Sequence, residues 1–176
     1  MRVALQIMKF CFALLYGLLK LLPMKNKVVF LSRQSNKPSI DFQMVAEVVA
    51  EKHPGYQCVM LCKKIGSGIG GKISYVMHMF RQLYHLATAR IVLLDSYAIL
   101  VSILKHKDTL LIVQMWHSVG TMKKAGYSIL GQEEGRSRQV ADILKMHHGY
   151  DYILCAGKGY KEHLMDLFNY PGENIV

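Results

Sequence analysis

The sequence has few acidic residues and lacks the motifs of several common functional classes. Twelve aspartates and glutamates stand against 22 lysines and arginines, which gives a formal net charge of +10 over 176 residues. Such a surplus suits nucleic acid, an anionic membrane or an acidic substrate. The basic residues are scattered in ones and twos, and the chain carries no helix-turn-helix, RNA-binding aromatic signature or zinc finger. We therefore expect no nucleic-acid partner.

Cysteine is also scarce, and no residue set has the spacing of a metal site. The four cysteines are Cys11, Cys58, Cys62 and Cys155. No pair has zinc-ligand spacing with a second pair to complete it, so we expect free thiols in a reducing compartment. His147 and His148 are adjacent and would face different ways on a helix. The chain has no G-x-S-x-G nucleophile elbow and no paired catalytic carboxylates. We expect neither a metal site nor a hydrolase.

The amino-terminal segment has the one long apolar run of the chain, and it is interrupted. Residues 10–19 are apolar or nearly so, but polar and basic residues break the wider segment, and no small-residue cleavage site follows it. We favour a helix that lies in the membrane interface, with a spanning signal-anchor and a buried helix as alternatives. The basic residues expected to face anionic head groups are Arg2, Lys9, Lys20, Lys25 and Lys27. This predicts a membrane-associating amphipathic helix over 1–25 and one folded lobe over 26–176.

The rest of the chain alternates strand-like and helix-like runs. Strand-like runs cover residues 28–32, 56–62, 91–94, 110–114 and 152–155, and helix-like runs cover 42–52, 73–89, 100–105, 135–148 and 160–168. Asp41 is placed to cap the first of these helices. Regular alternation of this kind predicts a parallel sheet with helices on both faces, a Rossmann-like α/β lobe.

A glycine-rich loop at 66–71 satisfies the pattern G-x-G-x-x-G between a strand and a helix. Asp95 ends the next strand, near the place of a ribose-binding acid. However, the dinucleotide fingerprint normally follows the first strand of the fold, and this loop follows the second. We therefore interpret the loop as a connection or a phosphate-contacting turn and expect no cofactor. A dinucleotide-dependent oxidoreductase remains the less favoured alternative.

A histidine follows the expected strand over 110–114 and lies in the turn after it. Ligands bind at strand ends in α/β proteins, and a histidine there titrates near neutral pH, so His117 can take a proton from a hydroxyl. Lys123 and Lys124 follow within a few residues and suit an anionic, phosphorylated substrate. An ordinary half-buried pair of Trp116 and His117 with two solvated lysines is the alternative on spacing alone.

Several stretches share their residues with one known family. The matching stretches are 27–35 with 41–42, 87–90 with 94–97, 114–120 with 123–127, and 150–152. On these stretches, from about residue 27 to the end, the chain resembles the CDP-glycerol glycerophosphotransferases, the teichoic-acid primases and polymerases of Gram-positive bacteria. The resemblance implies one lobe of a GT-B-type fold, the amino-terminal, acceptor-side lobe. The carboxyl-terminal lobe of the family, which holds the CDP-alditol site and a second essential histidine, is expected to lie outside these residues.

The resemblance also implies a function and a set of site residues. It makes His117 the catalytic base for the acceptor hydroxyl, and we expect six further residues to contact substrate: Trp116, Lys123, Lys124, Arg33, Asp95 and Ser96. The implied reaction moves glycerophosphate or ribitol phosphate from CDP-glycerol or CDP-ribitol to a lipid-linked, polyanionic acceptor. It would take place at the cytoplasmic face of the cell membrane, with the protein bound peripherally. The alternative is a truncated, non-catalytic membrane module that binds polyanionic polymer.

Overall fold

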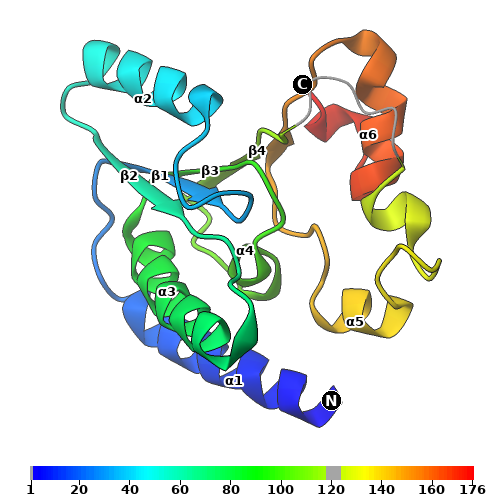
Figure 1. Cartoon of the computed structure of the whole chain (residues 1–176). Helices are drawn as coiled ribbons and strands as arrows, with labels where there is room; N and C mark the ends of the chain where they lie inside the picture. The colour runs from blue at the N-terminus through cyan, green and yellow to red at the C-terminus, as the bar shows by residue number, and fades with distance from the viewer. Residues whose placement is uncertain (1, 118–123) are drawn as a thin grey trace.

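Five parallel strands form one sheet in the computed structural model, which describes residues 2–117 and 124–176 (Figure 1). The strands are β1 (Lys27–Ser32), β2 (Gln57–Cys62), β3 (Ile91–Leu94), β4 (Leu111–Gln114) and β5 (Tyr152–Ile153). Their order in the sheet is β2-β1-β3-β4-β5, and each neighbouring pair is parallel. The predicted Rossmann-like parallel sheet is therefore confirmed.

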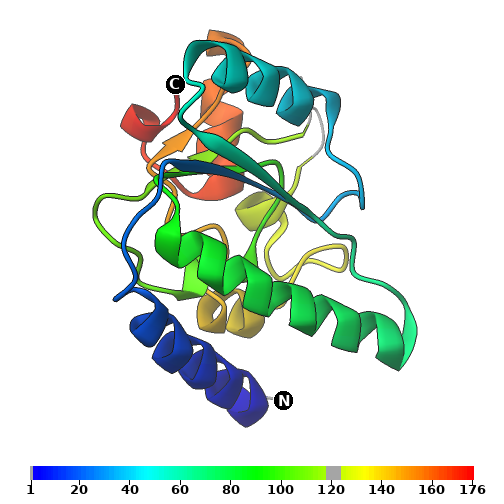
Figure 2. The ribbon, with the colours of Figure 1, turned by 90° about the vertical axis from the view of Figure 1, so that its left-hand side faces the viewer.

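Helices cover both faces of this sheet (Figure 2). The α-helices are α1 (Arg2–Leu19), α2 (Ile40–Lys52), α3 (Gly68–Thr88), α4 (Ile99–Ile103), α5 (Arg138–Ile143) and α6 (Lys161–Phe168). The short 3₁₀ turns are η1 (Gly126–Ile129), η2 (Lys158–Tyr160) and η3 (Gly172–Asn174). Helix α2 lies on one face, and α3, with α4 beside it, lies on the other (Figures 1 and 2).

The interior strand β1 explains why two layers of helices are needed. All six of its residues are buried, and the run from Val28 to Leu31 is continuously apolar, as expected for a strand covered on both faces. Val28 and Phe30 pack toward α2, where Phe30 meets Phe42 at a ring-centroid distance of 5.2 Å. Val29 and Leu31 point the other way, into the larger core. Alternate side chains of one strand thus join the two cores of the lobe.

Helix α1 forms an outer layer against α3 rather than part of the sheet's own cover (Figures 1 and 2). Phe12 and Tyr16 are its two buried residues. The Phe12 ring lies 5.7 Å from that of Phe80 on α3, and the Tyr16 hydroxyl lies 2.7 Å from Nδ1 of His106. Within the described residues, α1 is the single helix whose length and apolar composition would allow it to cross a membrane. Little of it is buried.

Four local details differ from the sequence predictions. The cap of α2 is Ser39, whose hydroxyl accepts a hydrogen bond from the Phe42 backbone, rather than Asp41. Lys27, expected to face lipid head groups, is buried, and its Nζ donates to Thr88 Oγ1 at 2.7 Å. The helix expected over 135–148 is limited to α5, because the backbone adopts positive φ at Lys145 and again at His147. Helix α3 begins earlier than expected, within the glycine-rich loop.

The strand order also bears on the dinucleotide alternative. The glycine-rich loop follows β2, which is the edge strand, whereas ligand crevices of open α/β sheets lie where the strand order reverses. Asp95 follows β3, and β1 lies between β2 and β3. The loop and the acid are therefore separated by a whole strand, which disfavours a dinucleotide site built from the two.

Candidate functional site

The predicted site residues converge at the carboxyl edge of the sheet. A sheet of order 2-1-3-4-5 reverses its direction of winding between β1 and β3, the position at which open α/β sheets bind their ligands. Arg33 directly follows β1, Asp95 and Ser96 directly follow β3, and Trp116 and His117 come just after β4. Three neighbouring strands thus bring five of the seven predicted site residues to one edge.

Hydrogen bonds between the loops fix their relative positions. The Arg33 backbone N–H donates to Ser96 Oγ at 3.0 Å, and the Gln34 backbone N–H donates to Ser32 Oγ at 3.1 Å. Ser96 is buried, so its hydroxyl is engaged in joining the loops after β1 and β3. The structure therefore gives Ser96 a loop-holding contact with Arg33 in place of an exposed surface for substrate.

His117 is held by two contacts through opposite ring nitrogens. Its Nδ1 lies 2.7 Å from the backbone carbonyl oxygen of Asp95, and its Nε2 lies 3.4 Å from the side-chain nitrogen of Gln34. A carbonyl oxygen only accepts, so Nδ1 carries the proton and donates it. Nε2 then presents its lone pair, toward which the Gln34 amide donates. The exposed ring is thus fixed in the tautomer that can accept a proton at Nε2.

Asp95 contributes to this arrangement through its backbone. Its side chain is buried, and burial raises the pKa of the carboxyl above its usual value, against the lowering by hydrogen bonds from Ser32 and Ser96 and by the nearby His117. Oδ1 has no hydrogen-bond partner within the described residues. The contact that the structure gives Asp95 with His117 is therefore through the backbone carbonyl, which orients the imidazole.

Trp116 has a backbone conformation that is rare for a large side chain. Its φ is 62°, in the left-handed region, and its N–H donates to the side-chain oxygen of the buried Gln114 at 3.0 Å. Bulky residues at positive φ are strained, and such strain collects at functional sites. The Trp116 ring lies 4.2 Å from that of His117 and meets the edge of Phe168 at 5.2 Å. The tryptophan therefore backs the histidine and ties it to α6.

Of the two predicted lysines, only Lys124 lies within the described residues. Lys124 is exposed at the start of the second described segment, just before η1. Lys123 lies outside the described residues. The exposed ammonium group of Lys124 is free to reach an anion in solvent, as the sequence predicts for a phosphorylated substrate.

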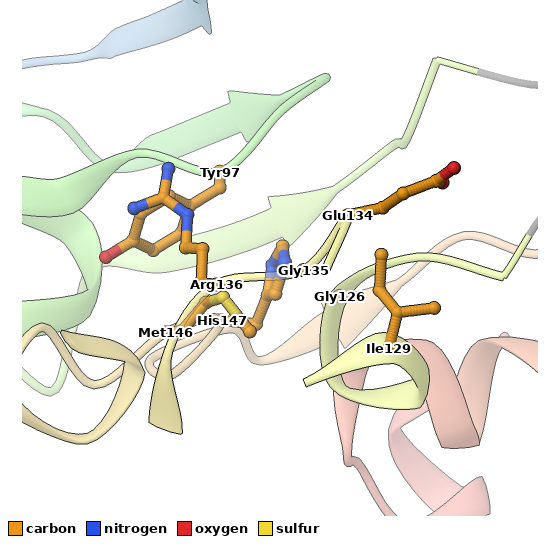
Figure 3. Close-up of a pocket in the computed structure, with 8 residues that line it drawn as sticks. All are labelled: Tyr97, Gly126, Ile129, Glu134, Gly135, Arg136, Met146 and His147. Carbon is orange, nitrogen blue, oxygen red and sulfur yellow. The ribbon is translucent and has the colours of Figure 1, made fainter. Parts of the chain in front are cut away.

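A cavity of about 200 Å³ lies close to this edge, and its residues were missed by the sequence reasoning (Figure 3). Its lining includes Tyr97, Arg136, Met146 and His147. Burial, with added effects from Arg136 and Arg33, lowers the pKa of His147 to about 3, so this imidazole is neutral at physiological pH. The one feature of the sequence that points to this cavity is Tyr97, which directly follows the predicted site residues Asp95 and Ser96.

Comparison with known proteins identifies the lobe. The fold defines a Rossmann-like α/β lobe whose predicted site residues lie at its switch point. Residues 14–176 match the family model of the CDP-glycerol:poly(glycerophosphate) glycerophosphotransferases, and the chain belongs to this family. The teichoic acid ribitol-phosphate primase of Bacillus spizizenii is 32% identical over 173 residues, which is 97% of this chain and 44% of the relative.

More distant matches agree with this assignment. The teichoic acid glycerol-phosphate primase of Bacillus subtilis is 23% identical over 124 residues, 70% of this chain and 30% of the relative. A solved structure of the wall teichoic acid polymerase TagF, a variant soaked with CDPG, has a TM-score of 0.65 at 14% identity and covers 99% of this chain and 48% of that one. The fold is that of one GT-B-type lobe, and the chain spans less than half the length of these relatives.

Proposed function

We propose that this chain is the acceptor-side lobe of a transferase that moves glycerophosphate or ribitol phosphate from a CDP-alditol donor to a lipid-linked acceptor. The observation that carries the proposal is the His117 imidazole, which donates through Nδ1 to the Asp95 carbonyl and so presents the lone pair of Nε2 as a proton acceptor. Membership of the glycerophosphotransferase family supports the substrate class. The donor lobe is expected from the remainder of the relatives' length.

The reaction requires an acceptor oxygen made nucleophilic. Nε2 of His117 takes the proton of the acceptor hydroxyl while the hydroxyl oxygen attacks the phosphorus that bears the alditol. A new phosphodiester bond forms, the phosphoanhydride bond breaks, and CMP leaves with the bonding electron pair. General-base catalysis of this kind contributes about 10²–10⁴-fold. The Gln34 amide, 3.4 Å from Nε2, marks the place that the acceptor hydroxyl takes.

Cationic side chains near the crevice supply electrostatic stabilisation. Phosphoryl transfer is catalysed mainly by positioning and by cations that hold the charge of the phosphoryl oxygens. Arg33 follows β1 directly and Lys124 is exposed, so both are placed to meet an anionic substrate. We include Lys123 on the family resemblance and its neighbouring position in the sequence.

The exposed apolar side chains of two adjacent helices support peripheral binding at a membrane. On α1 they are Val3, Ile7, Phe10, Leu14 and Leu18, and on α3 they are Ile69, Ile73, Val76, Met77 and Phe80. Apart from the adjacent Val76 and Met77, they are spaced three or four residues apart, which makes one stripe on each helix. The helices lie side by side (Figures 1 and 2). We name these ten residues the apolar face and propose that it lies in the interface, with Arg2, Lys25 and Lys72 toward anionic lipids at the cytoplasmic side.

Transfer by the complete gene product tests the proposed reaction. CDP-glycerol and CDP-ribitol are each supplied with a lipid-linked acceptor in vesicles, and CMP release and polymer labelling are followed together. Equal amounts of CMP and transferred alditol phosphate are expected with one of the two donors. If neither donor is consumed while the protein still binds the polymer, the non-catalytic module is favoured and the transferase proposal is wrong.

A further inference from the structure

The Tyr97 ring lies near two guanidinium groups that come from distant parts of the chain. Arg33 Cζ lies 5.6 Å from the ring centroid, and Arg136 Cζ lies 5.3 Å from it. The ring itself is fixed, because Tyr97 is buried and its hydroxyl donates to the Leu144 carbonyl at 3.0 Å. Two permanently charged groups are therefore gathered around one aromatic ring at the carboxyl edge of the sheet.

The cavity of about 200 Å³ opens beside Arg136 and Tyr97, which both line it (Figure 3). It is roomy in comparison with the ~10–15 Å³ that a single water needs. Arg136 and the neutral His147 line it, and the His147 ring meets that of Tyr97 edge-on at 5.3 Å. Glu134 also contributes to the lining, and its carboxylate points away from the Arg136 guanidinium (Figure 3).

The Arg33 guanidinium has hydrogen-bond donors that find no acceptor in the described part of the protein. Its Nε and Nη1 atoms are buried, and no acceptor among the described residues meets them. Buried donors of a charged group left unpaired are costly, and native proteins rarely keep them without a reason. Phosphate oxygens are acceptors that match a guanidinium in both charge and geometry.

The wall of the cavity depends on two glycines. Gly126 has φ of +58°, and a side chain there would collide with the Leu167 carbonyl oxygen. A side chain at Gly135 would collide with the Ile129 carbonyl oxygen. Both glycines let the loop around η1 approach its neighbours closely, so the shape of the cavity is built into the backbone.

The cavity and the His117 site are physically connected. Arg33 reaches toward Tyr97, while Gln34, the next residue, meets His117. On the other side the Phe168 ring meets the rings of both Trp116 and His147, at 5.2 Å and 4.9 Å. The two places therefore share the Arg33–Gln34 segment and the Phe168 ring.

We infer that the cavity bounded by Tyr97, Arg136 and His147 is a phosphate subsite for the acceptor, which binds the phosphodiester next to the reacting hydroxyl. The inference rests on the proposed function for the identity of the polymer. Arg136 supplies the guanidinium group in the lining, and Arg33, on the Tyr97 ring that forms part of the wall, adds a second positive charge nearby. This arrangement makes Arg136 a determinant of acceptor affinity, distinct from the catalytic His117.

Steady-state kinetics of Arg136→Met in the complete gene product test this subsite. Arg136 is exposed, so the variant is expected to fold, and circular dichroism checks this. Loss of one charge-assisted hydrogen bond predicts a rise of about tenfold or more in the KM for the acceptor, with the KM for the donor unchanged. Arg138→Met is the matched control, because it removes the same charge from an exposed position outside the cavity lining. A rise in the donor KM, or an unchanged acceptor KM, overturns the inference.

A binding measurement separates this inference from the proposed reaction. The probe is bis-glycerol phosphodiester, added to His117→Ala protein, and saturation-transfer NMR reports its binding without any turnover. Binding that is retained in Arg138→Met and lost in Arg136→Met supports the subsite even where no transfer occurs. Equal binding by both variants contradicts the subsite, whatever the enzyme's activity.

Discussion

Nδ1 of His117 lies 2.7 Å from the carbonyl oxygen of Asp95, a residue 22 positions earlier in the chain. The contact joins the ends of β4 and β3, which are neighbours in the sheet. A main-chain oxygen therefore selects the tautomer of the imidazole, and the orientation of the base is set by the fold itself.

Replacement of Asp95 by Asn tests the role of that backbone contact. The carbonyl survives the substitution, and the buried carboxyl is exchanged for an amide of the same shape, so we expect turnover close to that of the wild type. Asp95→Pro is the contrasting variant, because it disturbs the loop and removes the N–H that bonds Leu31. Radiolabelled transfer measures both. A loss of activity in Asp95→Asn would instead assign the carboxylate to substrate.

Gln34 is predicted to affect catalysis modestly. Its amide donates toward Nε2 of His117, and the net value of one neutral hydrogen bond corresponds to a fall of about twofold to tenfold in kcat/KM for Gln34→Ala. Gln43→Ala, an exposed glutamine on α2, is the matched control and should retain full kcat/KM. Wild-type kinetics in Gln34→Ala would show that its amide plays no part in the site.

The apolar face is predicted to bind anionic vesicles. Leu14→Glu or Ile73→Glu removes an apolar group worth about 1.5–3 kcal/mol when buried in lipid, so binding to phosphatidylglycerol vesicles should weaken by roughly 10- to 100-fold. Val48→Glu, on the exposed side of α2 across the sheet, should bind as the wild type does. Cosedimentation measures all three, and high salt should weaken binding further. Equal binding by Leu14→Glu and Val48→Glu would exclude this surface.

The lowered pKa of His147 predicts that the folded protein loses stability in acid. Its pKa is lowered from 6.5 to about 3 in the folded protein, mainly by burial. Between these two values the unfolded chain binds a proton that the folded chain does not, so the free energy of unfolding falls as the pH falls. The slope from this group approaches about 1.4 kcal/mol per pH unit.

Urea unfolding between pH 6.5 and pH 4 measures this slope for the wild type and for His147→Asn, in which it should be smaller. Phe168→Leu provides the control, because it removes packing against the His147 ring at 4.9 Å and keeps the titrating group. Its stability should be lower at every pH, with the wild-type slope. An unchanged slope in His147→Asn would contradict the assignment.

The sheet and the strand-end cluster were predictable from sequence for a simple reason. Apolar runs such as Val28–Ser32 are long enough to identify buried strands, and parallel strands place their carboxyl ends at one edge. The convergence of Arg33, Asp95 and His117 follows from that rule alone. The resemblance to the glycerophosphotransferases rested on the same strand-end residues.

The parts that sequence reasoning missed depend on backbone turns without a sequence signature. Lys145 and His147 take positive φ, which is uncommon for any residue but glycine, and so the helix expected there ends early and His147 turns inward. Arg136 meets Tyr97 from the loop between η1 and α5, which carries no sequence signature either. Likewise, the apolar residues around α1 do not reveal that Phe12 and Tyr16 are the two that pack against the lobe.

The most direct test of the account is the kcat of His117→Ala in the complete gene product, measured with the CDP-alditol that the wild type uses. The exposed imidazole adds little to the fold, so the variant should unfold at the wild-type temperature, while kcat falls by about 10²–10⁴-fold. His53→Ala, which removes another exposed histidine far along the chain, should keep the wild-type kcat. Undiminished turnover in folded His117→Ala protein would contradict the central claim that this histidine is the base.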